Sequence, residues 1–229
     1  MIAFCIPSRG LIYSRTVQTV IEGIYALQEK GISSIYCCSH DLPIPDCHNQ
    51  CVEQALAHKE VDTLVFIEED HYIEPAALVA LATNEADITT LQYNDKNGSP
   101  HGIIHYNEAG DILWAGLGAT AIKRQVFATL GEPYFRTDTL YKVTKKHLKD
   151  EKLITEYEPL TRRQEWNGKQ FDDIIDHYQY GGLDVDFYTR ARQAGFTVRK
   201  LEQYKAHHFE LVQLGEKYTN NGVHVIKQV

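Results

Sequence analysis

Three consecutive carboxylates follow an apolar run in the stretch DTLVFIEEDHYIEP, which covers residues 62–75. Glu68, Glu69 and Asp70 repel one another at the end of a strand unless a positive charge lies between them. Open sites with oxygen ligands suit Mg²⁺ or Mn²⁺ that also binds substrate phosphates, and an added imidazole favours Mn²⁺. We therefore interpret Asp70 as a metal ligand with Glu68 and Glu69 in supporting contacts, and we leave His71 outside the site. The alternative is an ordinary loop start whose polar residues cap the following helix.

A second group of metal-ligand types lies in the first quarter of the chain. The chain has five cysteines, an odd number, at Cys5, Cys37, Cys38, Cys47 and Cys51. This number argues for reduced thiols rather than a disulfide framework. Cys47 and Cys51, with His40 and His48 nearby, have a spacing that zinc tolerates. The sequence has no second pair of this kind, and we favour cysteines packed in the core over a zinc site.

The elements that position these residues alternate at short intervals through residue 93. Apolar runs predict strands at residues 2–6, 32–38, 64–67 and 86–93. Apolar residues at helical spacing predict helices between them, the first two capped by Ser14 and Asp46 and the third with Pro75 in its first turn. This alternation is typical of a mainly parallel sheet with helices on both faces. Ligands of such sheets bind beyond the carboxyl ends of the strands, which is where the three acids lie.

The pattern changes after residue 100. We predict a hairpin from the runs at 102–106 and 111–115, a strand at 119–122, and a short helix closed by Gly131. The polar and aromatic segment 136–180 is expected to contain a helix near 140–152 with mobile loops around it. The last expected elements are a helix that begins at Asp184 and ends at Gly195, and a strand at 196–201.

Length and composition favour one globular domain over residues 1–229. Of these residues 43% are hydrophobic and 24% are charged, which is ordinary for a folded domain, and no linker is visible. No apolar stretch reaches the roughly 20 residues that a membrane helix requires. The start, MIAFCIPSRG, lacks the layout of a secretory signal. We therefore expect a cytoplasmic location and no membrane span.

The formal net charge of −8 argues against a general nucleic-acid binder. Residues 136–169, however, carry nine Lys and Arg against six Asp and Glu, a local charge of +3 that leaves −11 for the rest of the chain. We favour a solvated helix face for this segment over a docking surface for a polyanion.

Several stretches, in their order and spacing, resemble the GT-A type of glycosyltransferase, the nucleotide-sugar-dependent class with a single Rossmann-like domain. They are CIPSRG, HNQCVEQAL, LVFIEEDHYIEPAAL, WAGLGATAIKRQVFATLGEPYF, GGLDVDFYTRARQAGFTV and AHHF, and they span residue 2 to about residue 210. The resemblance implies an α/β fold: a Rossmann-like mixed, mainly parallel sheet flanked by helices, with a small hairpin and a variable acceptor-side segment at about 136–180. In two places the chain departs from the family. Glu68 replaces the first Asp of the D-x-D motif, and Leu183 stands where members often have a Glu.

The resemblance also implies roles for single residues. It places the metal on Asp70 and a histidine, for which we prefer His208 to His207 because only one face of a strand points at the metal. It makes Asp184 the catalytic base, with Asp186 in reserve. The residues that it assigns to the nucleotide sugar are Pro7, Ser8, Arg9, Asp41, Asn49, Glu68, Glu69, Gly116 and Gly118.

The implied activity is transfer of a sugar from a nucleotide-sugar donor, expected to be a UDP-sugar, to an acceptor hydroxyl with inversion and with Mn²⁺ or Mg²⁺ as cofactor. Enzymes of this type act on polysaccharides, lipid-linked sugars, proteins, small metabolites and, in some bacteriophages, hydroxylated DNA bases. A polysaccharide or modified DNA is the acceptor that we expect. Two other classes stay open: a hydrolase that uses Asp70 and Asp184 as a carboxylate pair, and a non-catalytic nucleotide-binding module.

Overall fold

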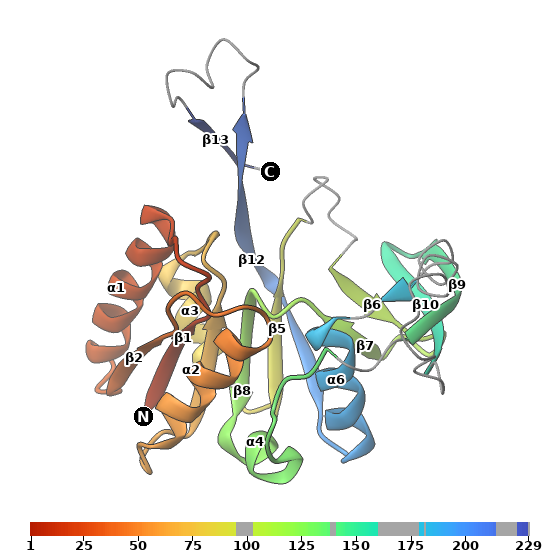
Figure 1. Cartoon of the computed structure of the whole chain (residues 1–229), viewed down its shortest axis with the longest axis horizontal. Helices are drawn as coiled ribbons and strands as arrows, with labels where there is room; N and C mark the ends of the chain where they lie inside the picture. Colours follow the sequence, from red (N-terminus) through yellow and green to blue (C-terminus); the bar gives the residue numbers. More distant parts are fainter. Residues whose placement is uncertain (95–102, 138–140, 160–178, 181, 214–223, 229) are drawn as a thin grey trace.

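The larger of two sheets forms the centre of the molecule (Figure 1). This computed structural model describes residues 1–94, 103–137, 141–159, 179–180, 182–213 and 224–228. The strands of the larger sheet are β1 (Ile2–Ile6), β2 (Ser34–Cys38), β3 (Thr63–Ile67), β4 (His71–Ile73), β5 (Ile88–Gln92), β8 (Ala119–Lys123), β12 (Val198–Gln213) and β13 (His224–Gln228). Their order is β13-β12-β5-β8-β3-β1-β2, and β4 pairs with β12 beside this path.

The larger sheet is mixed and mainly parallel. Strands β1, β2, β3, β5 and β12 share one direction, and β8 runs against its neighbours β3 and β5. The connections between parallel strands carry the helices, as such crossovers require. The sheet type that the sequence predicted is therefore confirmed.

Helices cover both faces of this sheet (Figure 1). Helices α1 (Ser14–Gln28) and α3 (Pro75–Ala82) pack on one face, and α2 (Asp46–Leu56), α4 (Arg124–Leu130) and α6 (Leu183–Gln193) pack on the other. Along β1, Ala3 and Cys5 join the core beneath α2, whereas Phe4 and Ile6 join the core beneath α1. Because successive side chains point to opposite faces, a strand covered on both faces has to be apolar throughout.

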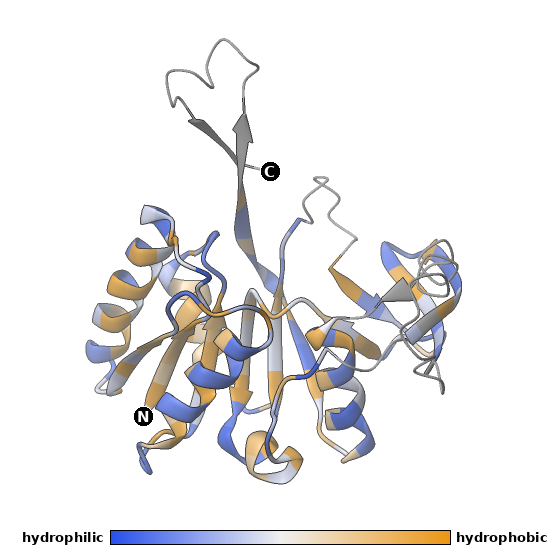
Figure 2. Ribbon diagram, in the orientation of Figure 1, coloured by the Kyte–Doolittle hydropathy of each residue, from blue (hydrophilic) through white to orange (hydrophobic). Residues whose placement is uncertain are grey.

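Figure 2 shows the result, with hydrophobic strands in the interior and helices that are hydrophilic on one side only. Within the described part of the chain, no helix is both long and apolar enough to span a membrane.

The smaller sheet corrects one sequence prediction. It contains β6 (Ile104–Tyr106), β7 (Ile112–Ala115), β9 (Tyr141–Lys149), β10 (Lys152–Pro159) and β11 (Gln179–Tyr180), in the order β11-β9-β10-β6-β7. The predicted hairpin is β6–β7, but the helix expected near 140–152 is wrong because β9 and β10 form an antiparallel hairpin there. Tyr141, Val143 and Ile154 are buried, and this burial on a pleated surface outweighs the helix propensity of the lysines between them. Much of 160–180 lies outside the described residues.

The ends of the helices differ in detail from the predictions. Ser14, Asp46 and Asp184 were expected as N-caps, but each lies within the first turn and no side chain caps these helices. Pro75 does start α3. Gly31 follows α1 with a φ of 71°, a conformation that glycine adopts without the steric cost of a Cβ.

The strand predicted at 196–201 is part of the longer β12, which leaves the body with β13 at the top of Figure 1. Strand β4 was not predicted.

Candidate active site

The chain turns sharply after β3 and brings Asp70 against β12. Glu68 N–H donates to the Gly118 carbonyl at 3.2 Å, and His71 N–H donates to the Glu68 carbonyl at 3.1 Å. Strand β4 then pairs antiparallel with β12, so that His71 lies directly opposite His208. Side chains opposite each other on neighbouring strands are in contact distance. Pairing of two distant segments therefore creates the site.

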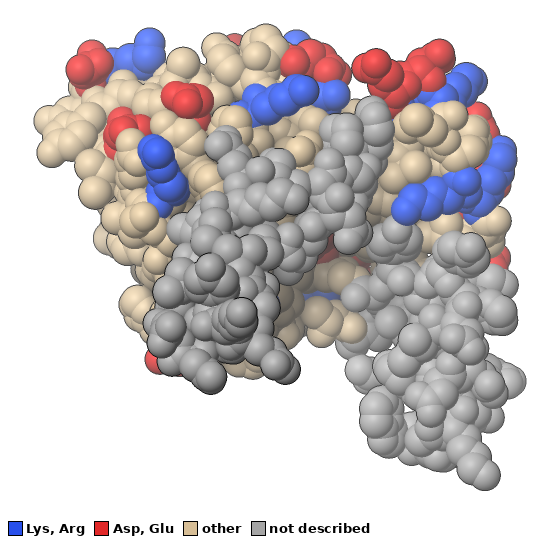
Figure 3. Space-filling model, turned by 90° about the horizontal axis from the view of Figure 1, so that it is seen from above, with Lys and Arg blue, Asp and Glu red and all other residues tan. Residues whose placement is uncertain are grey.

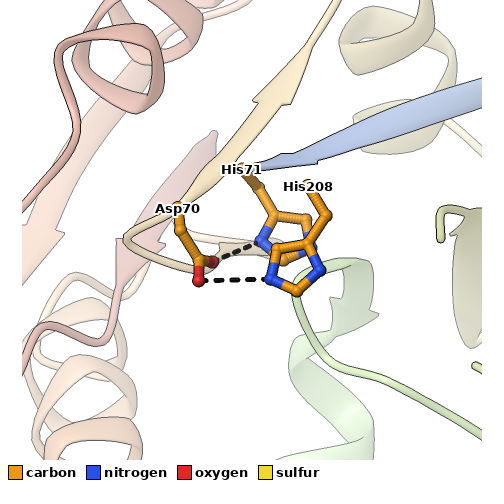
Figure 4. Close-up of side chains that lie close together, drawn as sticks. All are labelled: Asp70, His71 and His208. Carbon is orange, nitrogen blue, oxygen red and sulfur yellow. Dashed lines mark hydrogen bonds and ion pairs between the residues drawn. The ribbon is translucent and has the colours of Figure 1, made fainter. Parts of the chain in front are cut away.

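Asp70, His71 and His208 form a compact cluster (Figure 4). His71 Nδ1 lies 2.9 Å from Asp70 Oδ1, and His208 Nε2 lies 3.2 Å from Asp70 Oδ2. The two imidazole rings stack with centroids 4.6 Å apart and planes 14° apart. One potential ligand atom from each residue lies within 4.8 Å of the others, and no other group of three or more such residues occurs in the described ranges. His207 pairs instead with Tyr72, one residue further along the pleat.

The hydrogen bonds of His208 suit a metal ligand. Its Nδ1 lies 3.2 Å from the carbonyl oxygen of Asn94, which only accepts, so Nδ1 carries a proton. Nε2 then faces the carboxylate of Asp70, and this contact is favourable when Nε2 is protonated or when a cation lies between the two groups. Metal-binding histidines commonly donate their second ring N–H to a carbonyl in this way.

The charges of the cluster are strongly coupled. Burial lowers the pKa of His208, but the Asp70 carboxylate outweighs burial and raises this pKa above its ordinary value. Burial raises the pKa of Asp70, but hydrogen bonds from His208 and His71 hold it well below its usual range. Asp70 is therefore ionised at any physiological pH. One carboxylate and two imidazoles form a donor set that could hold a divalent metal ion.

Of the two imidazoles, His71 is the less suited to bind a cation. If Nδ1 binds a cation, the proton moves to Nε2, which is buried and has no hydrogen-bond partner among the residues described. An unsatisfied buried donor costs about 1–3 kcal/mol. His208 avoids this cost because its second ring nitrogen, Nδ1, is paired with the carbonyl oxygen of Asn94.

Gly118 and Tyr93 form the wall behind His71. A Cβ on Gly118 would lie 2.6 Å from both Cε1 and Nε2 of His71. The Tyr93 hydroxyl accepts a hydrogen bond from Gly118 N–H at 3.3 Å, and its ring packs edge-on against His71 with centroids 4.4 Å apart. The same hydroxyl occupies the space that a Cβ of Gly116 would need. Both glycines thus make room for side chains that support the cluster.

A pocket of about 260 Å³ opens beside Asp70. Its lining residues are Pro7, Arg9, Ile44, Cys47, His48, Glu68, Glu69, Asp70, Leu183 and Asp184. They come from the ends of β1 and β3, from the loop before α2 and its first turn, and from the start of α6. Arg9 binds Glu69 through Nε at 3.0 Å and Nη2 at 2.6 Å. The tertiary structure thus places six of the predicted site residues around one cavity.

Asp184 is the carboxyl group best suited to proton transfer in this pocket. It is half-buried in the first turn of α6, and burial raises its pKa to about 6. Burial also raises the pKa of Glu68, to which the charge of Asp184 contributes. Asp186, the reserve candidate, is buried in an ion pair with Arg190 at 2.7 Å and does not line the pocket.

Five residues assigned to the nucleotide sugar do not line the pocket: the two glycines behind His71, Gly116 and Gly118, and also Ser8, Asp41 and Asn49. Ser8 is buried and accepts a hydrogen bond from Gly10 N–H at 3.1 Å. Asn49 holds both backbone groups of Phe135, donating to its carbonyl at 3.0 Å and accepting from its N–H at 2.9 Å. Asp41 is exposed.

The cysteines predicted to pack in the core are part of the hydrophobic core. All five cysteines are free and buried. His48 packs against Phe66 and Phe135, and burial lowers its pKa to about 3. His40 is exposed, and these residues do not form a three-ligand group in the part of the chain that is described.

The sequence analysis missed His71 and Tyr93. The residue types of HYI do not alternate in polarity; only their burial alternates, with His71 and Ile73 buried and Tyr72 half-exposed once β4 pairs with β12. No local pattern of residue types therefore indicated that His71 points towards the interior.

Comparison with known proteins adds a likeness of fold. No family model matches the chain, and no curated protein matches it. The crystal structure of A197 from STIV is 20% identical, covers 91% of this chain and 85% of its own, and superimposes with a TM-score of 0.53. At this identity the likeness concerns the fold alone.

Two further solved structures are more distant. One is a glycosyltransferase involved in the glycosylation of the major capsid of PBCV-1, with 11% identity, 58% and 68% coverage of this chain and of its own, and a TM-score of 0.30. The other is a putative glucose-1-phosphate thymidylyltransferase from Bacillus anthracis in complex with a sucrose, with 12% identity, 58% and 74% coverage, and a TM-score of 0.35. Scores this low carry no argument about function.

The mixed, mainly parallel sheet with helices on both faces makes this an α/β protein with a Rossmann-like fold. At the carboxyl ends of its strands it carries a candidate metal site of one aspartate and two histidines.

Proposed function

We propose that the protein is a metal-dependent glycosyltransferase that moves a sugar from a nucleotide-sugar donor, a UDP-sugar, to an acceptor hydroxyl. The observation that carries this proposal is that Asp70 belongs both to the cluster with His71 and His208 and to the pocket that contains Asp184. A cation site and a carboxyl group with a pKa near neutrality thus border one cavity at the edge where α/β sheets bind ligands.

The cation would be held by Asp70, His208 and His71, and when bound it supplies Lewis-acid stabilisation of the leaving diphosphate. Mn²⁺ is the ion that we propose, because two of the three ligands are imidazoles. Glu68 and Asp184 offer carboxylate oxygens to sugar hydroxyls. Glu69 holds the guanidinium of Arg9 at the mouth of the pocket, where it can contact a phosphate.

In the proposed reaction Asp184 accepts the proton of the acceptor hydroxyl as that oxygen attacks the anomeric carbon. A base needs a pKa close to the working pH, and burial places the pKa of Asp184 at about 6. A single base that activates the acceptor implies inversion of configuration.

The acceptor that we propose is a polysaccharide hydroxyl or a hydroxylated base in DNA. In the basic segment, Lys145 is already paired with Glu108 at 2.7 Å and Glu156 at 3.1 Å. Figure 3, which looks down on the carboxyl-end face, shows acidic and basic side chains together around its rim. The described part of this face is therefore mixed in charge, which favours a neutral polysaccharide. Binding to DNA that strengthens as salt is lowered would favour the DNA acceptor.

The proposal is tested by incubating the protein with a panel of UDP-sugars and Mn²⁺ and measuring release of UDP. We expect release that requires the metal and that Asp70→Asn abolishes. Asp184→Asn should keep Mn²⁺ and UDP binding but lower transfer about 100-fold or more, the usual contribution of a general base.

The control is Asp46→Asn, which removes a carboxylate from the first turn of α2, outside the pocket. Absence of binding or thermal shift with every donor would contradict the transferase and favour a different ligand. Metal-independent cleavage of a glycoside that needs both Asp70 and Asp184 would favour the hydrolase.

A further inference from the structure

A second cavity, of about 530 Å³, lies away from the candidate active site. It is bordered by the β6–β7 hairpin, the C-terminal end of α6 and the start of β12, all of which can be followed in Figure 1. Arg199 in this cavity and His208 in the metal cluster both belong to β12. Between them β12 departs from regular pairing with β5, with a bulge between Lys200 and Lys205. The two cavities have no lining residue in common.

Four cationic side chains line this cavity: Lys152, Arg192, Arg199 and Lys200. Two acids also line it, Asp111 and Glu202. The acids do not neutralise all of the cations, because Glu202 is paired with Lys200 at 2.7 Å and Asp111 accepts a hydrogen bond from Asn107 at 2.9 Å.

Lys152, Arg192 and Arg199 have no carboxylate within ion-pair distance among the residues described. This concentration of positive charge occurs in a chain whose net charge is −8. Arg192 is in the last turn of α6, where a cation also interacts favourably with the helix dipole. The helix dipole accounts for the charge of Arg192, whereas Arg199 has no comparable partner among the residues described.

The remaining wall of the cavity is aromatic and apolar. Lys152 Nζ lies over the ring of Tyr106, 5.2 Å from its centroid. Phe196, Ile112 and Val198 complete this side, and none of the three is fully exposed. The volume exceeds that of a phosphate ion several-fold, so the cavity offers cations to one part of a ligand and a ring-sized apolar wall to another.

We propose that this cavity is a second ligand site, which binds a small phosphorylated molecule with a ring, such as a sugar phosphate or a nucleotide. The guanidinium groups of Arg192 and Arg199 bind the phosphate oxygens, because the planar fork of arginine matches phosphate geometry. Lys152 adds a third charge from the start of β10. The ring of the ligand lies against Tyr106 and Phe196.

Isothermal titration calorimetry with glucose 6-phosphate, inorganic phosphate and glucose tests this proposal. Glucose 6-phosphate should bind saturably and more tightly than inorganic phosphate, and glucose should not bind. The double variant Arg192→Ala/Arg199→Ala should weaken binding at least about tenfold. The matched control Lys30→Ala/Lys59→Ala also removes two cations, from exposed positions outside the cavity, and should bind as the wild type does.

Two further variants distinguish binding at this site from binding at the active site, and a loss of contacts from a failure to fold. Asp70→Asn should bind glucose 6-phosphate normally, since Asp70 is in the other pocket. If the arginine double variant does not fold, Lys152→Gln in the exposed hairpin should still weaken binding.

The proposal is wrong if glucose 6-phosphate does not saturate at millimolar concentration, or if the two double variants lose affinity equally. It is also wrong if Asp70→Asn abolishes binding. A DNA oligonucleotide that displaces glucose 6-phosphate at a much lower concentration would make the cavity part of a polyanion surface instead.

Discussion

At the scale of single residues, Gly118 has no side chain at the place where the imidazole of His71 lies. His71 cannot retreat easily, because Tyr93 and the stacked ring of His208 pack against it at centroid distances of 4.4 Å and 4.6 Å. Two stacked imidazoles beside one carboxylate are held by packing as well as by hydrogen bonds. The absence of a Cβ therefore determines the position of a ligand.

Gly118→Ala should weaken Mn²⁺ binding about 10- to 100-fold, the usual effect of disturbing residues that orient metal ligands. The added Cβ would lie 2.6 Å from two ring atoms of His71. Calorimetric titration with Mn²⁺ measures the effect. Gly182→Ala is the matched control, because its Cβ meets only a backbone nitrogen at 4.0 Å. Unchanged affinity in Gly118→Ala would show that His71 is not needed at the cation.

The carboxyl group of Asp184 also affects how the stability of the protein depends on pH. In the folded protein burial raises its pKa to about 6, whereas an unfolded chain releases this proton near its ordinary pKa of about 3.9. Between these two values the folded state holds more protons, so stability falls as the pH rises through this window. The cost of the ionised carboxylate is complete above pH 6.

Asp184→Asn removes this cost. The free energy of unfolding of the variant relative to the wild type should increase by about 1–3 kcal/mol between pH 4 and pH 7. Urea unfolding at several pH values in the presence of a chelator measures the difference. Asp46→Asn controls for loss of a carboxylate in the first turn of a helix. A pH-independent difference for Asp184→Asn would mean that its carboxyl group is not buried as described.

At the scale of elements, α2 is tied to the segment after α4 through Asn49. The two hydrogen bonds between this side chain and the backbone of Phe135 satisfy groups that a partly buried loop would otherwise leave unpaired. Phe135 in turn packs against Phe66 of β3, the strand that ends at the acids. Asn49 thus supports the pocket from outside it.

Asn49→Ala should lower the free energy of unfolding by about 1–3 kcal/mol and leave UDP and Mn²⁺ affinities unchanged. Chemical denaturation and calorimetry measure the two properties separately. Gln50→Ala, next to it on α2, is the control. The sequence-based role predicts the reverse result, weaker UDP binding at unchanged stability, and that outcome would place Asn49 at the nucleotide.

Sequence patterns were sufficient to predict the helices and strands of the first part of the chain. The alternation of apolar strands and amphipathic helices up to residue 93 predicted β1, α1, β2, α2, β3, α3 and β5, because each is buried on a periodic face. The lysine-rich run at 141–149 was mispredicted because most of its described side chains are exposed. Buried side chains alternate only at Tyr141 and Val143. The segment forms a strand because it pairs with β10.

At the scale of the whole molecule, a cation at the cluster would join the turn after β3 to β12, two parts of the chain far apart in sequence. Binding to the folded state alone stabilises a protein by about 2.7 kcal/mol at a ligand concentration 100 times the dissociation constant. In a chain of this size, that corresponds to a rise in Tm of about 5–10 °C.

We expect such a rise with Mn²⁺, a smaller one with Mg²⁺, and reversal by a chelator. Scanning calorimetry at matched ion concentrations measures it. His208→Ala should remove more of the shift than His71→Ala, since only His208 keeps its second ring nitrogen paired when the first binds a cation. His207→Ala, on the opposite face of β12, is the control. Equal shifts in the wild type and His208→Ala would contradict the metal site.

The sequence by itself determined the sheet type, the helices of the first half and the acids at the end of β3, because periodicity and local composition are properties of neighbouring residues. The tertiary structure decided which side chains meet. Asp70 and His208 come together only because β4 pairs with β12, and the same register places His71 beside them and turns His207 away. Pairing register over such a separation depends on the packing of the whole sheet, and no local pattern in DTLVFIEEDHYIEP records it.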